Sequence, residues 1–297
     1  MLTRPELDTM ASHASGQSCV PRVFDVEYRR AGAEALLARI YQPSGAGPFP
    51  ALLDVHGGVW TWKDRTRNAV VDHALAARGV LVAAIDFRLA PSAPYPASIA
   101  DVNYATRWLK AHAADFGADP ARVGGLGASS GGHMVTLSAM RPRDPRYAAL
   151  PLEEAPELDA TLAYVVALWP VLDPYGRYAY AQRTGRSNLV HGQDSYFGTL
   201  ATMSEASPLR ILERGEPVEL PPMLLVHGAV DQNVPLAMTE AFAAAYRKRG
   251  GSVDLEVVPG APHDFGLEEG PDTTRALQLI HAFVAHQSGQ RACDPAC

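Results

Sequence analysis

The chain has 297 residues, of which 47% are hydrophobic and 20% charged, and its formal net charge at pH 7 is −6. This balance is ordinary for a folded globular protein and excludes a chain that is disordered throughout. Because no block of Lys and Arg stands out, the sequence lacks the electrostatic signature of a nucleic-acid-binding protein, and we expect no nucleic-acid partner.

No apolar run approaches the roughly 18 residues needed to span a bilayer, and the first residues lack the apolar segment of a secretory signal. We therefore expect a cytoplasmic protein without a membrane partner. The three cysteines, Cys19, Cys293 and Cys297, fall in predicted flexible tails, residues 1–21 and 289–297. No His/Cys cluster accompanies them, so we expect free thiols rather than a disulfide or a metal site.

The chain opens with two strand-like runs, residues 23–30 and 35–43, which are separated by AGAE and predict an antiparallel hairpin. Six short apolar runs follow. Such near-continuous apolar runs are typical of strands buried on both faces of a parallel sheet. These runs are residues 51–58, 77–87, 121–129, 160–169, 221–231 and 253–260.

Helix-like stretches alternate with these strands, and their apolar residues recur at helical spacing. The predicted helices are residues 68–78, 98–116, 235–250 and 273–287. The alternation predicts an α/β fold with a mostly parallel, doubly wound sheet that is antiparallel at its start. We expect one domain, with its core in residues 22–169 and 221–288.

Residues 170–220 interrupt the alternation and are too long for a simple connection. We predict that they form an inserted helical cap over the carboxyl edge of the sheet, the edge at which open α/β sheets bind ligands. We also expect the last strand to lie at an edge of the sheet, where pairing with a second copy would give a homodimer.

Ser129 follows one predicted strand in the pattern Gly127-Ala-Ser-Ser-Gly131, which fits G-x-S-x-G. This motif turns the chain sharply from strand to helix, and the flanking glycines remove clashes at the turn. With Ser130 at the centre, one glycine position would be Ala128, which would clash. The pattern therefore predicts Ser129 as a nucleophile, and it leaves the Ser130 N–H free to donate to a developing oxyanion.

Two more candidates follow predicted strands. Asp231 comes after MLLVHGAV, and His263 lies in GAPHDF after the last strand. Nucleophile, acid and base in this chain order match one known arrangement of a serine hydrolase triad. His263 would take the proton of Ser129, and Asp231 would fix the imidazole tautomer. We do not expect Asp264 to be the acid, because a sequence neighbour cannot easily orient the ring.

The segment HGGVW follows the first parallel strand, and its glycines free backbone N–H groups to point at a carbonyl oxygen. We expect Gly58 to be an oxyanion donor, with either Gly57 or Val59 as its companion. We interpret His56 as a side chain that braces this loop rather than as a second base.

With these residues identified, the sequence resembles the α/β-hydrolase superfamily over about residues 23–286. It is most similar to hormone-sensitive-lipase-like esterases and to their kynurenine-formamidase and feruloyl/acetyl-esterase relatives. The motifs that carry the resemblance are HGGVW, DFRLAPSAPYPASIADV, GASSGG, HGAVDQNVP and GAPHDF. The resemblance implies the Ser129, Asp231 and His263 triad, an oxyanion hole from the HGG loop and Ser130, and no metal or organic cofactor.

Two departures bear on the substrate. Val59 stands where the lipase-like group usually has a third glycine, and Ala128 stands where it usually has Asp. We predict a serine hydrolase that cleaves carboxylic esters of small to medium acyl groups, with a small-molecule ester as its partner. The alternatives are an arylformamidase and, less favoured, a binding protein without catalysis. We expect Trp60 and Trp169 to line the substrate pocket.

Overall fold

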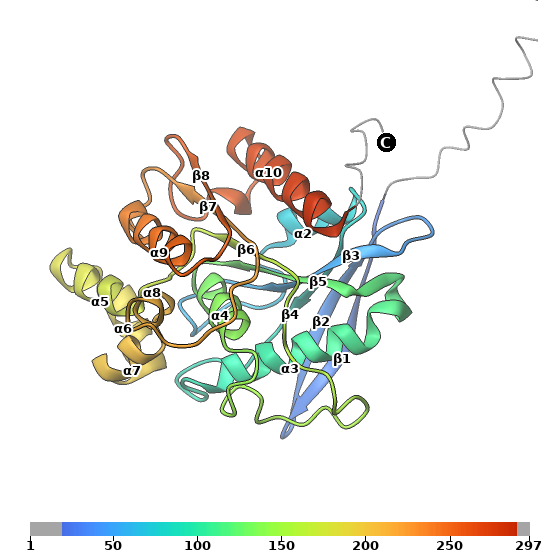
Figure 1. Ribbon diagram of the computed structural model, residues 1–297, viewed down its shortest axis with the longest axis horizontal. Coiled ribbons are helices and arrows are strands. Elements are labelled where there is room, and N and C mark those ends of the chain that lie inside the picture. The colour runs from blue at the N-terminus through green and yellow to red at the C-terminus, as the bar shows by residue number, and fades with distance from the viewer. Residues whose placement is uncertain (1–19, 290–297) are drawn as a thin grey trace, which may run out of the picture.

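The computed structural model describes residues 20–289. Its centre is an eight-stranded sheet in the order β1-β2-β4-β3-β5-β6-β7-β8 (Figure 1). The first two strands form the predicted antiparallel hairpin, β2 also pairs antiparallel with β4, and all other neighbours are parallel. The strands are β1 Arg22–Ala31, β2 Glu34–Gln42, β3 Phe49–Val55, β4 Leu81–Ile85, β5 Ala118–Ala128, β6 Val165–Leu168, β7 Met223–Gly228 and β8 Val253–Val258.

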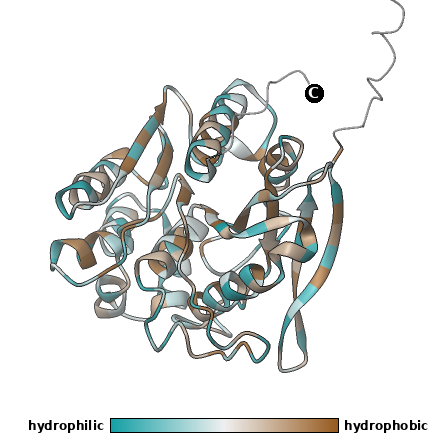
Figure 2. Ribbon diagram, turned by 45° about the vertical axis from the view of Figure 1, so that its right-hand side comes forward, coloured by the Kyte–Doolittle hydropathy of each residue, from teal (hydrophilic) through white to brown (hydrophobic). Residues whose placement is uncertain are grey.

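Helices cover both faces of the sheet, because each central strand presents apolar side chains alternately to the two sides. On β3, Leu52 belongs to one buried cluster, together with residues of α2 and α10, and Leu53 belongs to the other, with residues of α3, α4 and α9. Both polar and apolar segments are visible along these helices in Figure 2. Their bounds are α2 Ala69–Ala76, α3 Ala97–His112, α4 Ser130–Met140, α9 Leu236–Lys248 and α10 Pro271–Ser288.

The predicted fold class is therefore confirmed, and the position of β8 at a sheet edge is confirmed as well. Several strands are shorter than predicted. Residues 77–79 form the turn that ends α2, with Gly79 at φ 84°, so β4 begins only at Leu81. Residues 160–164 belong to an irregular segment, although Ala160, Leu162 and Tyr164 are buried. Ala163 and Tyr164 still exchange backbone hydrogen bonds with Val123 and Gly125 of β5, so the apolar run reaches the sheet just before the regular strand begins.

The segment between β6 and β7 contains four short helices (Figure 1). They are α5 Pro174–Arg183, α6 Ser187–Phe197, α7 Leu200–Glu205 and α8 Pro208–Glu213. These helices lie within residues 170–220, where the sequence predicts a helical insertion. That the insertion is a cap separate from the core stays a prediction. No helix among residues 20–289 is long and apolar enough to cross a membrane. The three cysteines lie outside the described residues.

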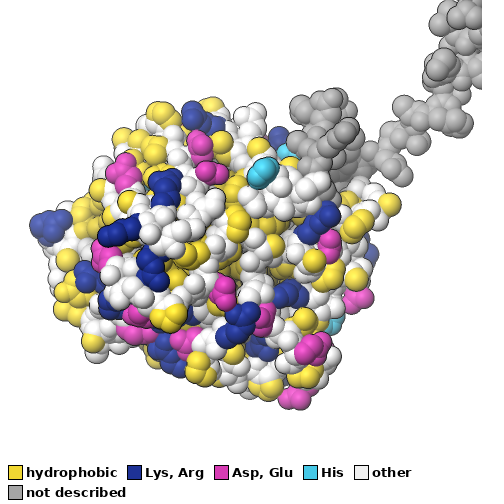
Figure 3. Space-filling model, viewed as in Figure 1, with side chains coloured by type: hydrophobic (Ala, Val, Ile, Leu, Met, Phe, Trp, Pro, Cys, Tyr) yellow, Lys and Arg dark blue, Asp and Glu magenta, His cyan; other side chains and the backbone are white. Residues whose placement is uncertain are grey.

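On the face seen in Figure 3, basic and acidic side chains are interspersed rather than gathered into a patch of one sign. This distribution agrees with the near balance of 26 basic and 32 acidic residues. It offers no broad cationic surface of the kind that follows a nucleic-acid backbone on this face.

Candidate active site

The turn between β5 and α4 places Ser129 at the carboxyl edge of the sheet. Its backbone has φ 54° and ψ −116°, a region that costs a non-glycine residue free energy. The turn is so tight that a Cβ on Gly127 would lie 2.6 Å from the Gly131 carbonyl oxygen. The start of α4 also lies so close to β3 that a Cβ on Gly131 would lie 1.9 Å from the Val55 oxygen. The two glycines therefore allow the turn and its close approach to β3, and Ser129, which is only 6% exposed, lines the cavity at this edge of the sheet.

The structure brings the three predicted triad residues together. His263 Nε2 lies 3.0 Å from Ser129 Oγ, and His263 Nδ1 lies 2.6 Å from Asp231 Oδ2. The three residues follow β5, β7 and β8, whose carboxyl ends lie at one edge of the sheet. In this chain of hydrogen bonds, Nδ1 donates to the carboxylate and Nε2 is left to accept the serine proton.

Asp231 is held in its charged form by its contacts. Burial alone would raise its pKa, but hydrogen bonds with His227 and His263 and from the Val234 N–H outweigh burial and keep the pKa well below the usual range. Its other oxygen, Oδ1, accepts from the N–H groups of Asn233 and Val234 at 2.7 and 2.9 Å. An acid that is ionised at neutral pH can stabilise an imidazolium on His263.

His227 is a neighbour of the triad that the sequence reasoning missed. Its Nε2 lies 2.9 Å from the Val234 carbonyl oxygen and 3.3 Å from Asp231 Oδ2, so this nitrogen carries the proton. Its Nδ1 accepts from the Thr239 hydroxyl at 3.0 Å. The spacing of four residues between His227 and Asp231 was the available signal, and His227 helps to fix the carboxylate plane.

Asp264 lies in a different position from the triad acid. Its Oδ1 is 3.7 Å from His263 Nε2, the side that faces Ser129, and its Oδ2 pairs with Arg67 at 3.0 Å. Its backbone is left-handed, with φ 65°, which turns the side chain away from Nδ1. The geometry agrees with the prediction that a sequence neighbour does not orient the ring.

The predicted oxyanion loop follows β3 and lies against the nucleophile. A Cβ on Gly57 would be 3.2 Å from Ser129 Cβ, and Gly58 has φ 126°. The N–H groups of Gly57, Gly58, Val59 and Ser130 donate to no acceptor within residues 20–289. They are therefore free for a ligand oxygen, and the assignment of individual donors stays a prediction.

The side chain of His56 contacts and supports the predicted oxyanion loop. Its Nδ1 lies 2.6 Å from the Gly57 carbonyl oxygen, which must accept, and its ring stacks on Phe87 with a centroid distance of 4.3 Å. Burial lowers the pKa of His56 to about 4, so the ring is neutral at pH 7. These contacts fit the predicted bracing role.

The prediction that Trp60 and Trp169 line the pocket is wrong in this structure. Trp60 has φ 63°, which turns its side chain into the core, where it is 1% exposed and stacks on Tyr196 at 5.2 Å. Trp169 is fully buried and packs on Phe265 at 4.7 Å. The tryptophan that does line the cavity is Trp62, which is 54% exposed.

The cavity at Ser129 has a volume of about 120 Å³ and is lined both by loops that follow the strands and by α5 and α6 of the segment between β6 and β7. That is below the roughly 300 Å³ of a typical drug-sized ligand pocket, so it suits a small group. Its polar lining was not foreseen from the sequence. The lining residues other than the catalytic loops are Trp62, Lys63, Arg67, Asn68, Arg177, Asn188, Leu189, Asn233, Asp264 and Leu267.

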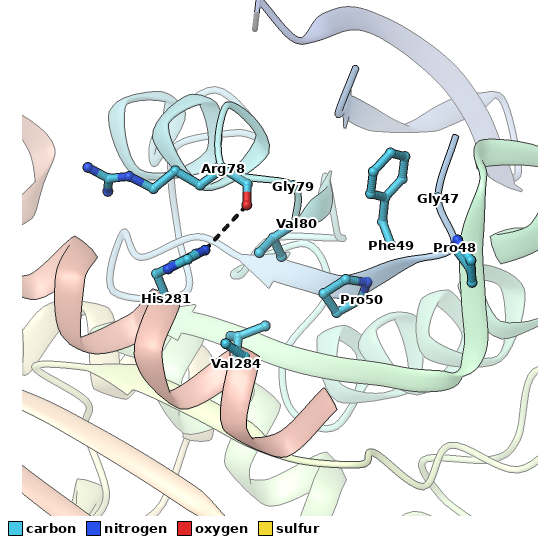
Figure 4. Close-up of a pocket in the computed structure, with 10 residues that line it drawn as sticks. Gly47, Pro48, Phe49, Pro50, Arg78, Gly79, Val80, His281 and Val284 are labelled. Atoms are coloured by element: carbon cyan, nitrogen blue, oxygen red, sulfur yellow. Dashed lines mark hydrogen bonds between the residues drawn. The ribbon is translucent and has the colours of Figure 1, made fainter. Parts of the chain in front are cut away.

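A larger cavity, of about 330 Å³, lies away from the triad (Figure 4). It is bounded by Pro48–Pro50 and by Gly79 and Val80, at the amino ends of β3 and β4, and by His281 and Val284 of α10. Ligands of open α/β sheets bind at the carboxyl ends of the strands. The chemistry therefore belongs to the smaller cavity.

A buried acidic pair lies beneath the catalytic loops. Asn68, which lines the cavity, donates from Nδ2 to both oxygens of Asp54 at 2.9 and 3.0 Å. Neither carboxylate oxygen of Asp72 has a partner among residues 20–289. Burial raises the pKa of Asp54 to about 7 and that of Asp72 well above its usual range. The pair therefore holds protons at pH values where exposed carboxyls have lost them.

Comparison with known proteins identifies the family. Residues 39–246 match the family model BD-FAE. The chain belongs to the BD-FAE family of α/β-hydrolases. It is 41% identical to the carboxylic ester hydrolase LipN of Mycobacterium tuberculosis over 264 residues, 84% of this chain and 67% of LipN. It is 31% identical to the esterase LipC of the same organism over 259 residues, 82% of this chain.

The BD-FAE chain covers 60% of LipC and 63% of the esterase LipQ, so it spans less than two thirds of the length of these relatives. A butyrate-bound structure of esterase 2 from Thermogutta terrifontis has the same fold, with a TM-score of 0.73 and 24% identity. That likeness covers 92% of this chain and 96% of the esterase.

Proposed function

We propose that this BD-FAE protein is a serine hydrolase that cleaves carboxylic esters of small to medium acyl groups through an acyl-enzyme. The observation that carries the proposal is the hydrogen-bonded chain from Ser129 Oγ through His263 to Asp231, with distances of 3.0 and 2.6 Å. Support comes from LipC and LipN, which are named as an esterase and a carboxylic ester hydrolase.

In the proposed reaction, Ser129 Oγ attacks the ester carbonyl carbon as His263 Nε2 takes the hydroxyl proton. The oxyanion that forms is stabilised by free N–H groups of the Gly57–Gly58 loop and Ser130. His263 then gives its proton to the leaving alcohol oxygen, which leaves an acyl group on Ser129. A water molecule, deprotonated by His263, attacks this acyl group, and the acid departs as Ser129 recovers its proton.

The arylformamidase alternative uses the same triad, and the relatives named above do not favour it. The small cavity of about 120 Å³ also suits a short acyl group better than a bulky aromatic amide. Ester hydrolysis is therefore the reaction to test first. A homodimer through β8 and a cytoplasmic location stay predictions.

The test is hydrolysis of p-nitrophenyl acetate, butyrate and octanoate beside N-formylkynurenine. We expect ester turnover to exceed formamide turnover and to fall with chain length. Ser129→Ala should reduce ester hydrolysis by about 10⁴-fold or more and abolish labelling by a fluorophosphonate probe. Ser138→Ala, which alters another buried serine on α4, is the matched control and should keep wild-type activity. Retained turnover in folded Ser129→Ala would refute the proposed nucleophile.

A further inference from the structure

Arg177 is an unusual side chain in the wall of the catalytic cavity. It belongs to α5 of the cap, it is only 1% exposed, and it lines the same cavity as Ser129 and His263. Its Nε donates to the Asn233 carbonyl oxygen at 3.2 Å, and its Nη1 donates to Gln193 Oε1 at 3.2 Å. Both acceptors are neutral, so neither hydrogen bond gives the buried guanidinium an anionic partner.

No carboxylate among residues 20–289 forms an ion pair with Arg177. Burial lowers the pKa of Arg177 to about 10, which still leaves the guanidinium charged at pH 7. Asp231 is the acid whose charge acts on it, but the oxygens of Asp231 already accept from His263, from His227 and from two backbone N–H groups. A buried cation without a partner is costly, because buried charges in proteins are ordinarily paired, and an anionic group of a ligand would supply the missing partner.

The guanidinium also has an unused donor. Nη2 donates no hydrogen bond to any of the residues that the structure describes, whereas Nε and Nη1 are occupied. The ring of Trp60 lies 5.8 Å from the guanidinium carbon and supports the group from one side. The protein therefore holds the Arg177 side chain in place and leaves Nη2 without an acceptor among the described residues.

The other cations of the cavity are arranged differently. Arg67 is paired with Asp264 at 3.0 Å, and Lys63 Nζ lies 3.7 Å from the centre of the Trp62 ring. Three cationic side chains and one carboxylate outside the triad give the cavity wall a positive balance. Such a wall favours an anionic group over a neutral group of the same size.

We propose that Arg177 binds a carboxylate of the substrate, so that the preferred esters carry a free carboxylate a few atoms from the scissile bond. The inference rests on the proposed ester hydrolysis and adds the substrate class to it. The carboxylate belongs either to the acyl part, as in a half-ester of a short dicarboxylic acid, or to the alcohol part, as in an acylated hydroxy acid. The cavity volume of about 120 Å³ limits the spacer to a short chain.

The test compares kcat/KM within two matched pairs of substrates. Hydrolysis is monitored by titrating the released acid at constant pH and ionic strength. Monomethyl glutarate is paired with methyl pentanoate for the acyl side, and 3-acetoxypropionate with propyl acetate for the alcohol side. We expect the wild-type enzyme to prefer the anionic member of one pair by roughly 10- to 100-fold, the value of one charge-assisted contact. The pair that shows the preference identifies the side.

Arg177→Gln should remove this preference, mainly by lowering kcat/KM for the anionic substrate. Arg177→Lys should retain part of the preference. Arg186→Gln is the matched control, because Arg186 also ties the cap to residues 232 and 233 but does not line the cavity. This control should keep the wild-type preference. If Arg177→Gln lowered kcat/KM equally for the anionic and the neutral member of a pair, the role of Arg177 would be purely structural and the proposal would be overturned.

Wild-type protein alone provides a second measurement, which holds even if the Arg177 variants do not fold. Glutarate should inhibit ester hydrolysis roughly 10-fold more strongly than glutaramide, its neutral counterpart. Equal inhibition, together with equal kcat/KM within both substrate pairs, would overturn the carboxylate site and leave ester hydrolysis standing. Absence of any Ser129-dependent hydrolysis of neutral or anionic esters would overturn the proposed function itself.

Discussion

Replacement of Asp231 by asparagine tests the roles assigned within the triad. Oδ1 of Asp231 sits where two backbone N–H groups donate to it, at 2.7 and 2.9 Å. In Asp231→Asn the amide oxygen will occupy that position, which leaves the NH₂ group facing His263 Nδ1. The NH₂ group can only donate, so Nδ1 must accept and Nε2 must carry the proton. Nε2 then cannot take the proton of Ser129.

We expect this wrong tautomer to lower kcat/KM for a neutral ester by about 10³- to 10⁴-fold, which corresponds to roughly 4–5.5 kcal/mol of transition-state stabilisation. The same NH₂ group also meets the Nε2–H of His227, where Asp231 Oδ2 now lies at 3.3 Å. A modest loss of stability should therefore accompany the loss of activity. The assay is steady-state hydrolysis, with circular dichroism and thermal unfolding to establish that the variant is folded.

Asp264→Asn is the matched control, since it makes the same chemical change one residue from His263. Asp264 is half-exposed and pairs with Arg67, so we expect its replacement to change kcat/KM by less than about 10-fold. If Asp231→Asn stayed within 10-fold of wild type while Asp264→Asn fell by 10³-fold, the assignment of the acid would be refuted.

Two further predictions concern stability. Gly131→Ala would place a Cβ 1.9 Å from the Val55 oxygen, so we expect the free energy of unfolding to fall by about 3 kcal/mol or more in urea unfolding. Gly270→Ala is the control, since a Cβ there meets open space, and it should cost only about 1 kcal/mol or less through the poorer N-cap of α10. The raised pKa values of Asp54 and Asp72 mean that the folded state binds these two protons more tightly than the unfolded chain, so each carboxyl contributes a fall in the free energy of unfolding as pH rises from about 4 to 7. Buried His56 and His133, whose pKa values are lowered to about 4, contribute in the opposite direction, so the carboxyl contribution is measured as a difference between variant and wild type. Asp72→Asn should make the slope of the unfolding free energy against pH more positive than that of wild type by about 1.4 kcal/mol per pH unit, measured by urea unfolding at several pH values, and an unchanged slope would contradict the raised pKa of Asp72.

Patterns that depend on local sequence and on strand ends were accessible from the sequence. The positions of Ser129, Asp231 and His263 follow from the rule that parallel strands bring their carboxyl ends to one edge. The direction of the Trp60 side chain could not be predicted from such patterns. Its direction depends on positive φ angles at Val59 and Trp60 after the glycines, and on aromatic residues of α6 far along the chain.

Arg177 was missed for a related reason. An arginine in a short cap helix reads as a solvent-exposed residue, since most arginines are exposed. Its burial arises from the way α5 packs against the loop after β7, where Asn233 accepts its hydrogen bond. The pairing of Asp54 with Asn68 is likewise invisible until α2 is placed on the sheet. Charged residues in a core are set by tertiary packing, which single-sequence patterns do not encode.

The backbone of Ser129, at φ 54° and ψ −116°, has a consequence for how this protein changes under selection. Glycine accepts that conformation without the steric conflict that serine meets, so relief of strain and loss of the nucleophile come with the same substitution. A screen that rewards only resistance to heat would therefore enrich inactive chains at this position. Under the proposed function, directed evolution of thermostability needs an activity selection at every round, because the substitution that relieves backbone strain at residue 129 also removes the proposed nucleophile.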